Sequence, residues 1–148
     1  MASWQQWLAK GDIKTHQTSK QEIDNLRALI TRDLADAGVA GLSADRRFAT
    51  AYNAALQAAT IAIACSGYRV SARSGHHKVT FEAAALSLGA NAIPLADYFD
   101  ACRRKRNVID YMTSSVATET EAEEIVLKAR EFHALVEMWA KKAYPTMF

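Results

Sequence analysis

A cluster of basic side chains interrupts the apolar pattern of the segment from Asn91 to Met112. The apolar residues of this segment recur at spacings of four and three, at Leu95, Phe99, Cys102 and, after one interruption, Ile109. Arg106 is the interruption, so we expect it on the inward-facing stripe of a helix. An arginine there must find partners or open onto a cleft, because an unpaired buried charge costs several kcal/mol. The partners predicted for it are Asp110, or Asp100 or Asp97; a salt-bridged arginine with a merely structural role is the alternative.

The neighbours of Arg106 extend this basic cluster. Arg103, Arg104 and Lys105 precede it and Asn107 follows, so some of these cations must point outward from the helix. Residues 43–112 contain nine basic and five acidic residues, a net charge of +4, whereas residues 1–42 are neutral and residues 113–148 carry −2. This asymmetry permits binding of phosphates or of an acidic partner, but is too small to identify nucleic acid as the ligand.

Histidines and cysteines are the other residues with chemical potential. His76 and His77 end a basic connection, Gly67 to His77, that also contains Arg73, and we expect both in a loop, where a solvated linker is the alternative to a site. His133 lies near the apolar face of the last predicted helix; it either approaches Arg106 or hydrogen-bonds a carboxylate. No Cys/His pairing has metal-ligand spacing, so we expect no metal site and no cofactor.

Composition indicates how these residues are positioned. The chain has 148 residues, of which 50% are hydrophobic and 23% charged, with only six Gly, two Pro and two Cys. A chain of this length buries enough surface to fold as one domain without disulfides. The scarcity of Gly and Pro argues against disorder and against a turn-rich β-sandwich. We therefore predict an all-α protein.

Capping residues and apolar periodicity predict where the helices begin and end. Ser19 with Glu22 has the form of a reciprocal capping box, Ser43 precedes the most apolar helix, and Thr118 with Glu121 or Thr120 with Glu123 begins the last helix. The predicted helices are Ser3 to Lys10, one from Ser19 to Gly38, Ala44 to Ser66, Lys78 to Leu88, Asn91 to Met112 and Glu119 to Lys142.

These helices predict an antiparallel four- to five-helix bundle over residues 19–142, with residues 1–18 as a peripheral N-terminal helix and loop of the same single domain. Trp4 and Trp7 are expected to dock that helix on the bundle. The first thirty residues lack the apolar stretch of a signal peptide, and the run Ala54 to Cys65 is too short to cross a bilayer. We expect no membrane association and a reducing cytoplasmic setting.

The stretch from Asp100 to Tyr111, with Ala129 to Phe132 and Val136 to Trp139 in the last helix, resembles the C-terminal half of a HEPN domain. The similarity extends over Gln21 to Trp139, but only the Arg-Asn segment is specific. The resemblance implies a small helical bundle that dimerises through the helices bearing the motif. It also implies a toxin–antitoxin role with a minimal nucleotidyltransferase partner. Active members of the family resemble one another in a metal-independent RNase motif, Arg-Asn followed by three residues and His.

This chain departs from the motif at its last position. Arg106 matches the motif arginine and Asn107 the following residue, but Tyr111 stands in place of the histidine. Histidine can move a proton in such a site while arginine stabilises developing phosphate charge, whereas tyrosine, with an ordinary pKa near 10, is a poor base at neutral pH. We therefore expect that the chain is not an enzyme.

Three functions remain open. The first is a HEPN-like protein that binds nucleotide, RNA or a nucleotidyltransferase through Arg103, Arg106, Asn107 and Tyr111. The second is an active metal-independent endoribonuclease that uses Arg106 with Tyr111 or with a histidine from elsewhere; the residues considered in support are Asp110, His133, Arg73 and His77. The third is a helical interaction module with no nucleotide chemistry.

Overall fold

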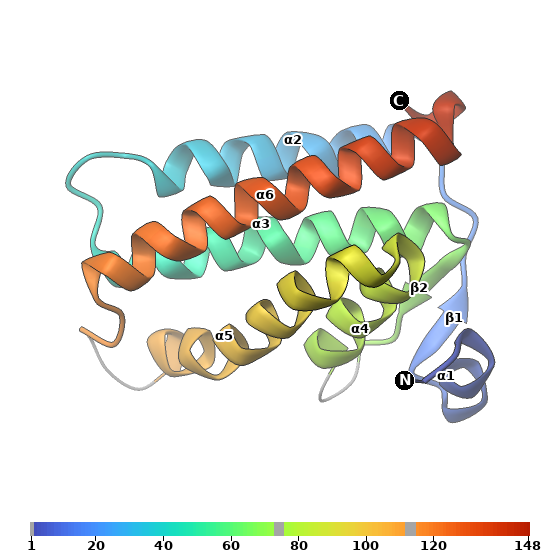
Figure 1. The fold of residues 1–148 in the computed structure, drawn as a ribbon, viewed down its shortest axis with the longest axis horizontal. Helices are drawn as coiled ribbons and strands as arrows, with labels where there is room; N and C mark the ends of the chain where they lie inside the picture. Colours follow the sequence, from blue (N-terminus) through green and yellow to red (C-terminus); the bar gives the residue numbers. More distant parts are fainter. Residues whose placement is uncertain (1, 73–75, 112–114) are drawn as a thin grey trace.

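The computed structural model of the chain describes residues 2–72, 76–111 and 115–148. They form six α-helices, two short strands and two 3-10 turns (Figure 1). The helices are α1 (Trp4–Lys10), α2 (Lys20–Ala37), α3 (Ala44–Cys65), α4 (His76–Leu88), α5 (Ile93–Tyr111) and α6 (Glu119–Ala143). The all-α helical-bundle prediction is confirmed, with the expected short helix at the N-terminus.

Helix α3 is the centre of the bundle, in contact with α2, α4, α5 and α6. Figure 1 shows α2, α3 and α6 side by side along the long axis, with α4 and α5 on the other side of α3. The inward positions of α3 are mostly alanines, including Ala51, Ala55, Ala58 and Ala62, none of which is exposed. Small side chains allow neighbouring helices to approach closely, which explains how one helix can contact four others.

Larger side chains fill the space around this alanine-rich helix. Phe81 of α4, Phe99 of α5 and Phe132 of α6 are buried against one another, with the rings of Phe81 and Phe99 stacked at 5.5 Å between centroids. Burial of aromatic rings of this size is among the largest single contributions to a core. The aromatic cluster therefore fixes the C-terminal part of the bundle around α3.

Side-chain caps start several helices at the predicted residues. Ser43 Oγ accepts a hydrogen bond from the Arg46 amide, and Thr118 with Glu121 forms a reciprocal capping box at the start of α6. The reciprocal box predicted at Ser19 is wrong: Ser19 caps α2 through the Glu22 amide, but the Glu22 carboxylate binds His16 and Thr18 instead. A stronger charge-assisted partner explains the difference.

The described parts of the connection from Gly67 to His77 contain a short strand and the start of a helix, which the sequence did not predict. Residues Tyr68–Val70 form β2, which pairs antiparallel with β1 (Ile13–Thr15), with Ile13 opposite Val70. The expectation that His76 and His77 lie in a loop is wrong, since both belong to the first turn of α4. The other end of α4 leads through the 3-10 turn η1 (Ala90–Ala92) into α5, and the chain ends in η2 (Pro145–Met147).

The N-terminal helix docks as predicted. Trp7 is 3% exposed and packs in a small apolar cluster with Ile13, Ile63 and Ala83, while the Trp4 ring stacks on Tyr68 of β2 at 4.5 Å. This packing fixes α1 and the small sheet to the ends of α3 and α4.

One helix, α3, is long and apolar enough to cross a membrane by length and composition. Seventy-two per cent of its most apolar window is buried inside the fold. That is the behaviour of the core helix of a soluble protein.

Candidate functional site

Arg106 lies on the inward side of α5, as its spacing predicts. Leu95, Phe99 and Cys102 on the preceding turns are buried, and Arg106 continues their stripe toward α3. Its Nη2 donates to Asn53 Oδ1 at 3.1 Å, and its guanidinium lies over the Tyr52 ring, 5.7 Å from the centroid. Consecutive residues of α3 thus hold the guanidinium by a hydrogen bond and by a cation–π contact.

Asn53 is a hydrogen-bond partner of Arg106 that the sequence-based expectation of an acid did not include. Asp100, one of those acids, accepts from Arg103 Nε at 3.2 Å, and Asp97 is exposed. The side chains of Asp110 and Tyr111, as well as all of Arg73, lie outside the described residues. The pairing of Asn53 with Arg106 depends on the packing of α5 against α3, which the spacing of residues within one helix does not give.

The other cations of α5 are distributed around the helix. The Arg103 side chain is 30% exposed, Lys105 forms an ion pair with Glu121 of α6, and Arg104 and Asn107 are exposed. Arg103 and Arg106 therefore lie where α5 approaches α3, while Arg104 points to solvent. The predicted phosphate-binding residues divide into one fixed guanidinium, Arg106, a second beside it, Arg103, and an exposed amide.

A histidine reaches this cluster from a different helix. His77, in the first turn of α4, places Nδ1 3.1 Å from the Tyr52 hydroxyl. Tyr52 is fully buried. Its hydroxyl is hydrogen-bonded to His77, and its ring faces the guanidinium of Arg106. We call the side chains of Tyr52, Asn53, His77, Arg103 and Arg106 the Arg106 cluster.

Burial and positive charge make His77 a neutral histidine. Desolvation lowers its pKa to about 4, with further lowering by the charges of His76, Arg106 and Arg103. Burial raises the pKa of Tyr52 well above its ordinary value, so the phenol stays protonated. At neutral pH the Tyr52–His77 contact is therefore a hydrogen bond between uncharged groups. When Nδ1 donates to the phenol oxygen, Nε2 carries the free lone pair of the ring.

His133 is not brought to the Arg106 cluster. Its Nε2 lies 3.2 Å from Oε1 of Glu137, one turn further along α6, and the same oxygen accepts from Arg27 Nε of α2 at 2.7 Å. Burial alone would raise the pKa of Glu137, but the hydrogen bond and charge of Arg27, with His133, hold it below its usual range. Of the two predicted environments for His133, the carboxylate-bonded one is found.

The remaining chemically capable residues have ordinary surroundings. Cys65 and Cys102 are free and buried, and burial raises the pKa of each thiol to about 11. Among the described residues, no group of three or more His, Cys, Asp or Glu side chains is arranged to hold a metal ion. Tyr98 and Phe99 pack into or against the core, which is the core role that helical spacing of aromatics favours.

Sequence reasoning missed the central part played by Tyr52. It falls on the inward stripe of α3 with Phe48 and Ala55, where an aromatic residue is read as core, and it is indeed buried. The available signal was its adjacency to Asn53, because neighbouring residues of one helix can contact the same arginine. His77 was considered in support, but its approach depends on α4 beginning at His76.

Comparison of the chain with protein-family models, curated proteins and solved structures finds no match in any of the three. The fold and the site define the class of protein as an all-α helical bundle with a basic cluster between α3, α4 and α5.

Proposed function

We propose that the Arg106 cluster binds a phosphate group of a nucleotide or an RNA, in the manner the resemblance to HEPN domains implies. The observation that carries this proposal is the fixed guanidinium of Arg106. Its position is set by Asn53 and the Tyr52 ring, and Arg103 lies near enough to lower the pKa of the same histidine. Guanidinium groups recognise phosphate oxygens through charge-assisted hydrogen bonds, and a preformed position reduces the entropy lost on binding.

The environment of His77 supports an anionic ligand. The charges of His76, Arg106 and Arg103 all lower the pKa of His77, so the electrostatic potential that they produce at its imidazole is positive. A phosphate placed beside the imidazole would be attracted by that potential. Asn107, exposed on the next position of α5, is available to hydrogen-bond a ribose or base.

The proposed context follows the resemblance: a cytoplasmic toxin–antitoxin-type protein that forms homodimers through α5 and acts with a minimal nucleotidyltransferase. Homodimerisation would place two Arg106 clusters in one cleft, which suits an extended ligand such as RNA better than a single nucleotide. Size-exclusion chromatography with light scattering measures the oligomeric state. Co-expression with a nucleotidyltransferase encoded by a neighbouring gene, followed by co-purification, tests the partner.

Binding of a short single-stranded RNA at several salt concentrations tests the proposal. We expect Arg106→Ala to weaken binding about tenfold or more, since a charge-assisted hydrogen bond contributes roughly 1.5–3 kcal/mol. The slope of log affinity against log salt concentration should also become shallower by about 0.7 for each phosphate that the arginine neutralises in the parent. Lys142→Ala removes the same charge from the exposed end of α6 and is the matched control. Equal binding by the parent and Arg106→Ala would refute the assignment.

A metal-independent endoribonuclease is the second candidate, favoured by the approach of His77 to Arg106. In that reaction His77 Nε2 accepts the proton of a ribose 2′-hydroxyl, and the 2′-oxygen forms a bond to the adjacent phosphorus. The bond from phosphorus to the 5′-oxygen breaks, which leaves a 2′,3′-cyclic phosphate and a 5′-oxygen that takes up a proton from water to become a hydroxyl. Arg106 stabilises the charge that develops on the phosphoryl oxygens.

Cleavage of mixed RNA in excess EDTA tests this second candidate. An active parent with inactive His77→Ala and Arg106→Ala variants would establish the reaction. An active His77→Ala variant would exclude His77 as the base, and inactivity of the parent would leave the binding function.

A further inference from the structure

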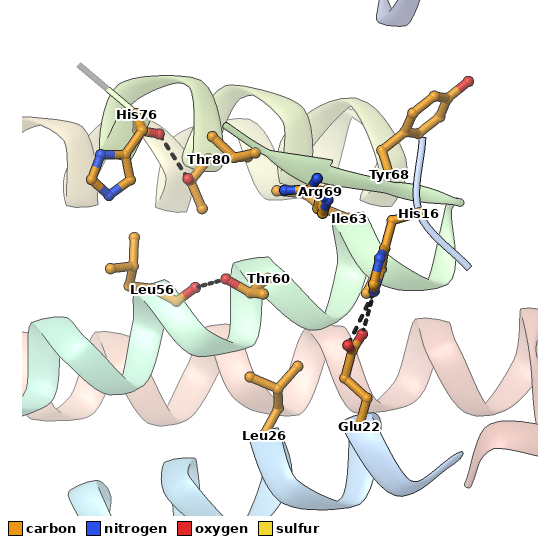
Figure 2. A pocket seen from close by; sticks show the side chains of 12 residues that line it. His16, Glu22, Leu26, Leu56, Thr60, Ile63, Tyr68, Arg69, His76 and Thr80 are labelled. Atoms are coloured by element: carbon orange, nitrogen blue, oxygen red, sulfur yellow. Dashed lines mark hydrogen bonds and ion pairs between the residues drawn. The ribbon is translucent and has the colours of Figure 1, made fainter. Parts of the chain in front are cut away.

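A second candidate site lies beside the Arg106 cluster, with His76 in its lining and the rings of His76 and His77 4.3 Å apart between centroids. A cavity of about 380 Å³ opens there between α2, α3, β2 and the start of α4. Figure 2 shows Leu56, Thr60 and Ile63 of α3 on one side of it, Leu26 and Glu22 of α2 below, and Arg69 and Thr80 above. A volume of this size falls within the range of small-molecule pockets, roughly 300–1,000 Å³.

Apolar side chains make most of the interior. Leu26, Leu56, Ile63 and Val70 come from three different elements and converge on the cavity. Leu26, Leu56 and Val70 are only partly buried, so they retain apolar surface that a ligand could remove from water. This lining favours a ligand with an aliphatic body.

The charges on the lining favour an anionic end. Glu22 is already engaged, with its carboxylate 2.8 and 3.0 Å from His16 Nε2 and 2.6 Å from the Thr18 hydroxyl. The side chain of Arg69, in contrast, makes no hydrogen bond or ion pair with any other described residue. The cavity therefore contains a carboxylate that is compensated and a guanidinium that no described side chain compensates.

The small sheet adds a second cation to the same edge. Arg69 of β2 stands directly opposite Lys14 of β1, and side chains opposite each other in an antiparallel pair share one face. Like charges in this position destabilise the pair unless an anion lies between them. The arrangement is thus suited to a carboxylate or phosphate held beside the apolar cavity.

We propose that this cavity binds a small anionic amphiphile, with its aliphatic chain against Leu26, Leu56 and Ile63 and its acidic group on Arg69. The acidic group can be the carboxylate of a fatty acid or the phosphate of an alkyl phosphate. No residue of the Arg106 cluster lines this cavity, although His76 of the lining is next to His77. Amphiphile binding and RNA binding are therefore measured separately, and either proposal can fail without the other.

Isothermal titration calorimetry with decanoate tests the site on the full chain. We expect saturable one-to-one binding with a dissociation constant below about 1 mM. A parallel titration with decyl phosphate shows whether the site prefers a phosphate or a carboxylate. Decyltrimethylammonium has the same chain with the opposite charge and should bind at least about tenfold more weakly. Equal affinity for the anionic and cationic amphiphiles would overturn the proposal, as would absence of decanoate and decyl phosphate binding.

Two variants assign the ligand to this cavity. Thr60→Phe fills it from an exposed position of α3, and Arg69→Gln removes the cation without changing the apolar lining. Each should weaken decanoate binding about tenfold. Arg46→Gln, an exposed arginine near the start of α3, is the matched control and should bind as the parent does. If Thr60→Phe does not fold, as judged by circular dichroism, Arg69→Gln alone decides: affinity unchanged within about twofold would overturn the proposal.

Discussion

Two histidines of this chain lie in opposite electrostatic environments. His133 and Arg27 share one carboxylate oxygen of Glu137, and Lys141 lies 3.7 Å from the other. His77 is instead bonded to a neutral phenol and lies near enough to Arg103 and Arg106 for their charges to lower its pKa. The Glu137 cluster, defined as Glu137, Arg27, His133 and Lys141, gathers cations around an anion.

The difference separates a structural ion cluster from a candidate binding site. In the Glu137 cluster the carboxylate of α6 neutralises the guanidinium of Arg27 in α2. Removal of Glu137 therefore leaves Arg27 without its counter-charge. In the Arg106 cluster the potential at His77 is positive, which favours an anion supplied from outside the protein. A sequence in which Arg, His and Asp or Glu occur together does not distinguish these cases; the contacts of the described side chains do, since Glu137 bonds both Arg27 and His133 whereas His77 bonds a phenol.

The largest expected effect is on the Glu137 cluster. Glu137→Ala should lower the free energy of unfolding by about 3 kcal/mol, because the side chain is only 14% exposed and its loss leaves Arg27 half-buried without its carboxylate. Urea denaturation measures this change. Glu131→Ala, at an exposed position of the same helix, is the control and should shift stability by less than about 0.5 kcal/mol.

The same variant tests whether the Glu137 and Arg106 clusters are independent. At a temperature where Glu137→Ala is folded, its RNA affinity should equal that of the parent. A Glu137→Ala protein as stable as the parent would show that the ion cluster does not hold α2 to α6. Loss of RNA affinity in the folded variant would show that the two clusters are coupled.

An intermediate effect concerns acid stability. The pKa of His77 falls from 6.5 to about 4 on folding, so the native state binds fewer protons than the unfolded state between these pH values. The free energy of unfolding must then decrease as the pH is lowered from 6.5 to 4. The shift corresponds to at most about 3 kcal/mol, and partial exposure of His77 reduces this amount.

His77→Gln should remove this part of the pH dependence. Urea denaturation at about pH 7, 5.5 and 4 measures it, with His16→Gln as the control for a histidine that is paired with a carboxylate. Glu137, whose pKa is lowered on folding, loses its stabilising contribution as the pH falls below the ordinary value of 4.5, because the unfolded state takes up the proton more readily than the native state. Identical pH profiles for the parent and His77→Gln would contradict the assigned environment of His77.

The smallest expected effect is that of the Tyr52 hydroxyl. Tyr52→Phe keeps the ring that packs on Phe81 and lies under Arg106, and removes only the hydrogen bond to His77. We expect a loss of about 1 kcal/mol of stability by thermal or urea denaturation, the ordinary value for a buried hydrogen bond. A loss several times larger would mean that the hydroxyl has a further structural partner.

Local chemistry explains how far the sequence predicted the fold. Ser43 and Thr118 cap helices through residues three positions away, so their pattern is visible in the sequence. The pairing of Ile13–Thr15 with Tyr68–Val70 joins segments more than fifty residues apart and has only three residues per strand, too few for a period-two pattern to be recognised. The sheet was therefore missed, and with it the strand Tyr68–Val70 in the connection before α4.

The candidate site was predicted in the same uneven way. The periodicity of α5 placed Arg106 on the inner stripe, because a helical position depends on spacing within one segment. Asn53 and Tyr52 approach it from α3 and His77 from α4, and these approaches depend on how helices pack. His77 was recognised from the sequence by itself, but its contact with Tyr52 beside Arg106 required the three-dimensional structure.

Titration of the histidines by NMR, with and without a bound oligonucleotide, tests the central claim most directly. An oligonucleotide with 2′-deoxyribose at each position prevents cleavage. In the free protein we predict a pKa of about 4 for His77. The NMR signal of His77 is identified by its absence in the His77→Gln variant. A phosphate bound at Arg106 should raise that pKa toward about 6.5 or above, because an anion favours the imidazolium, and should leave His133 unchanged. Binding of the oligonucleotide with no change at His77 would contradict the account.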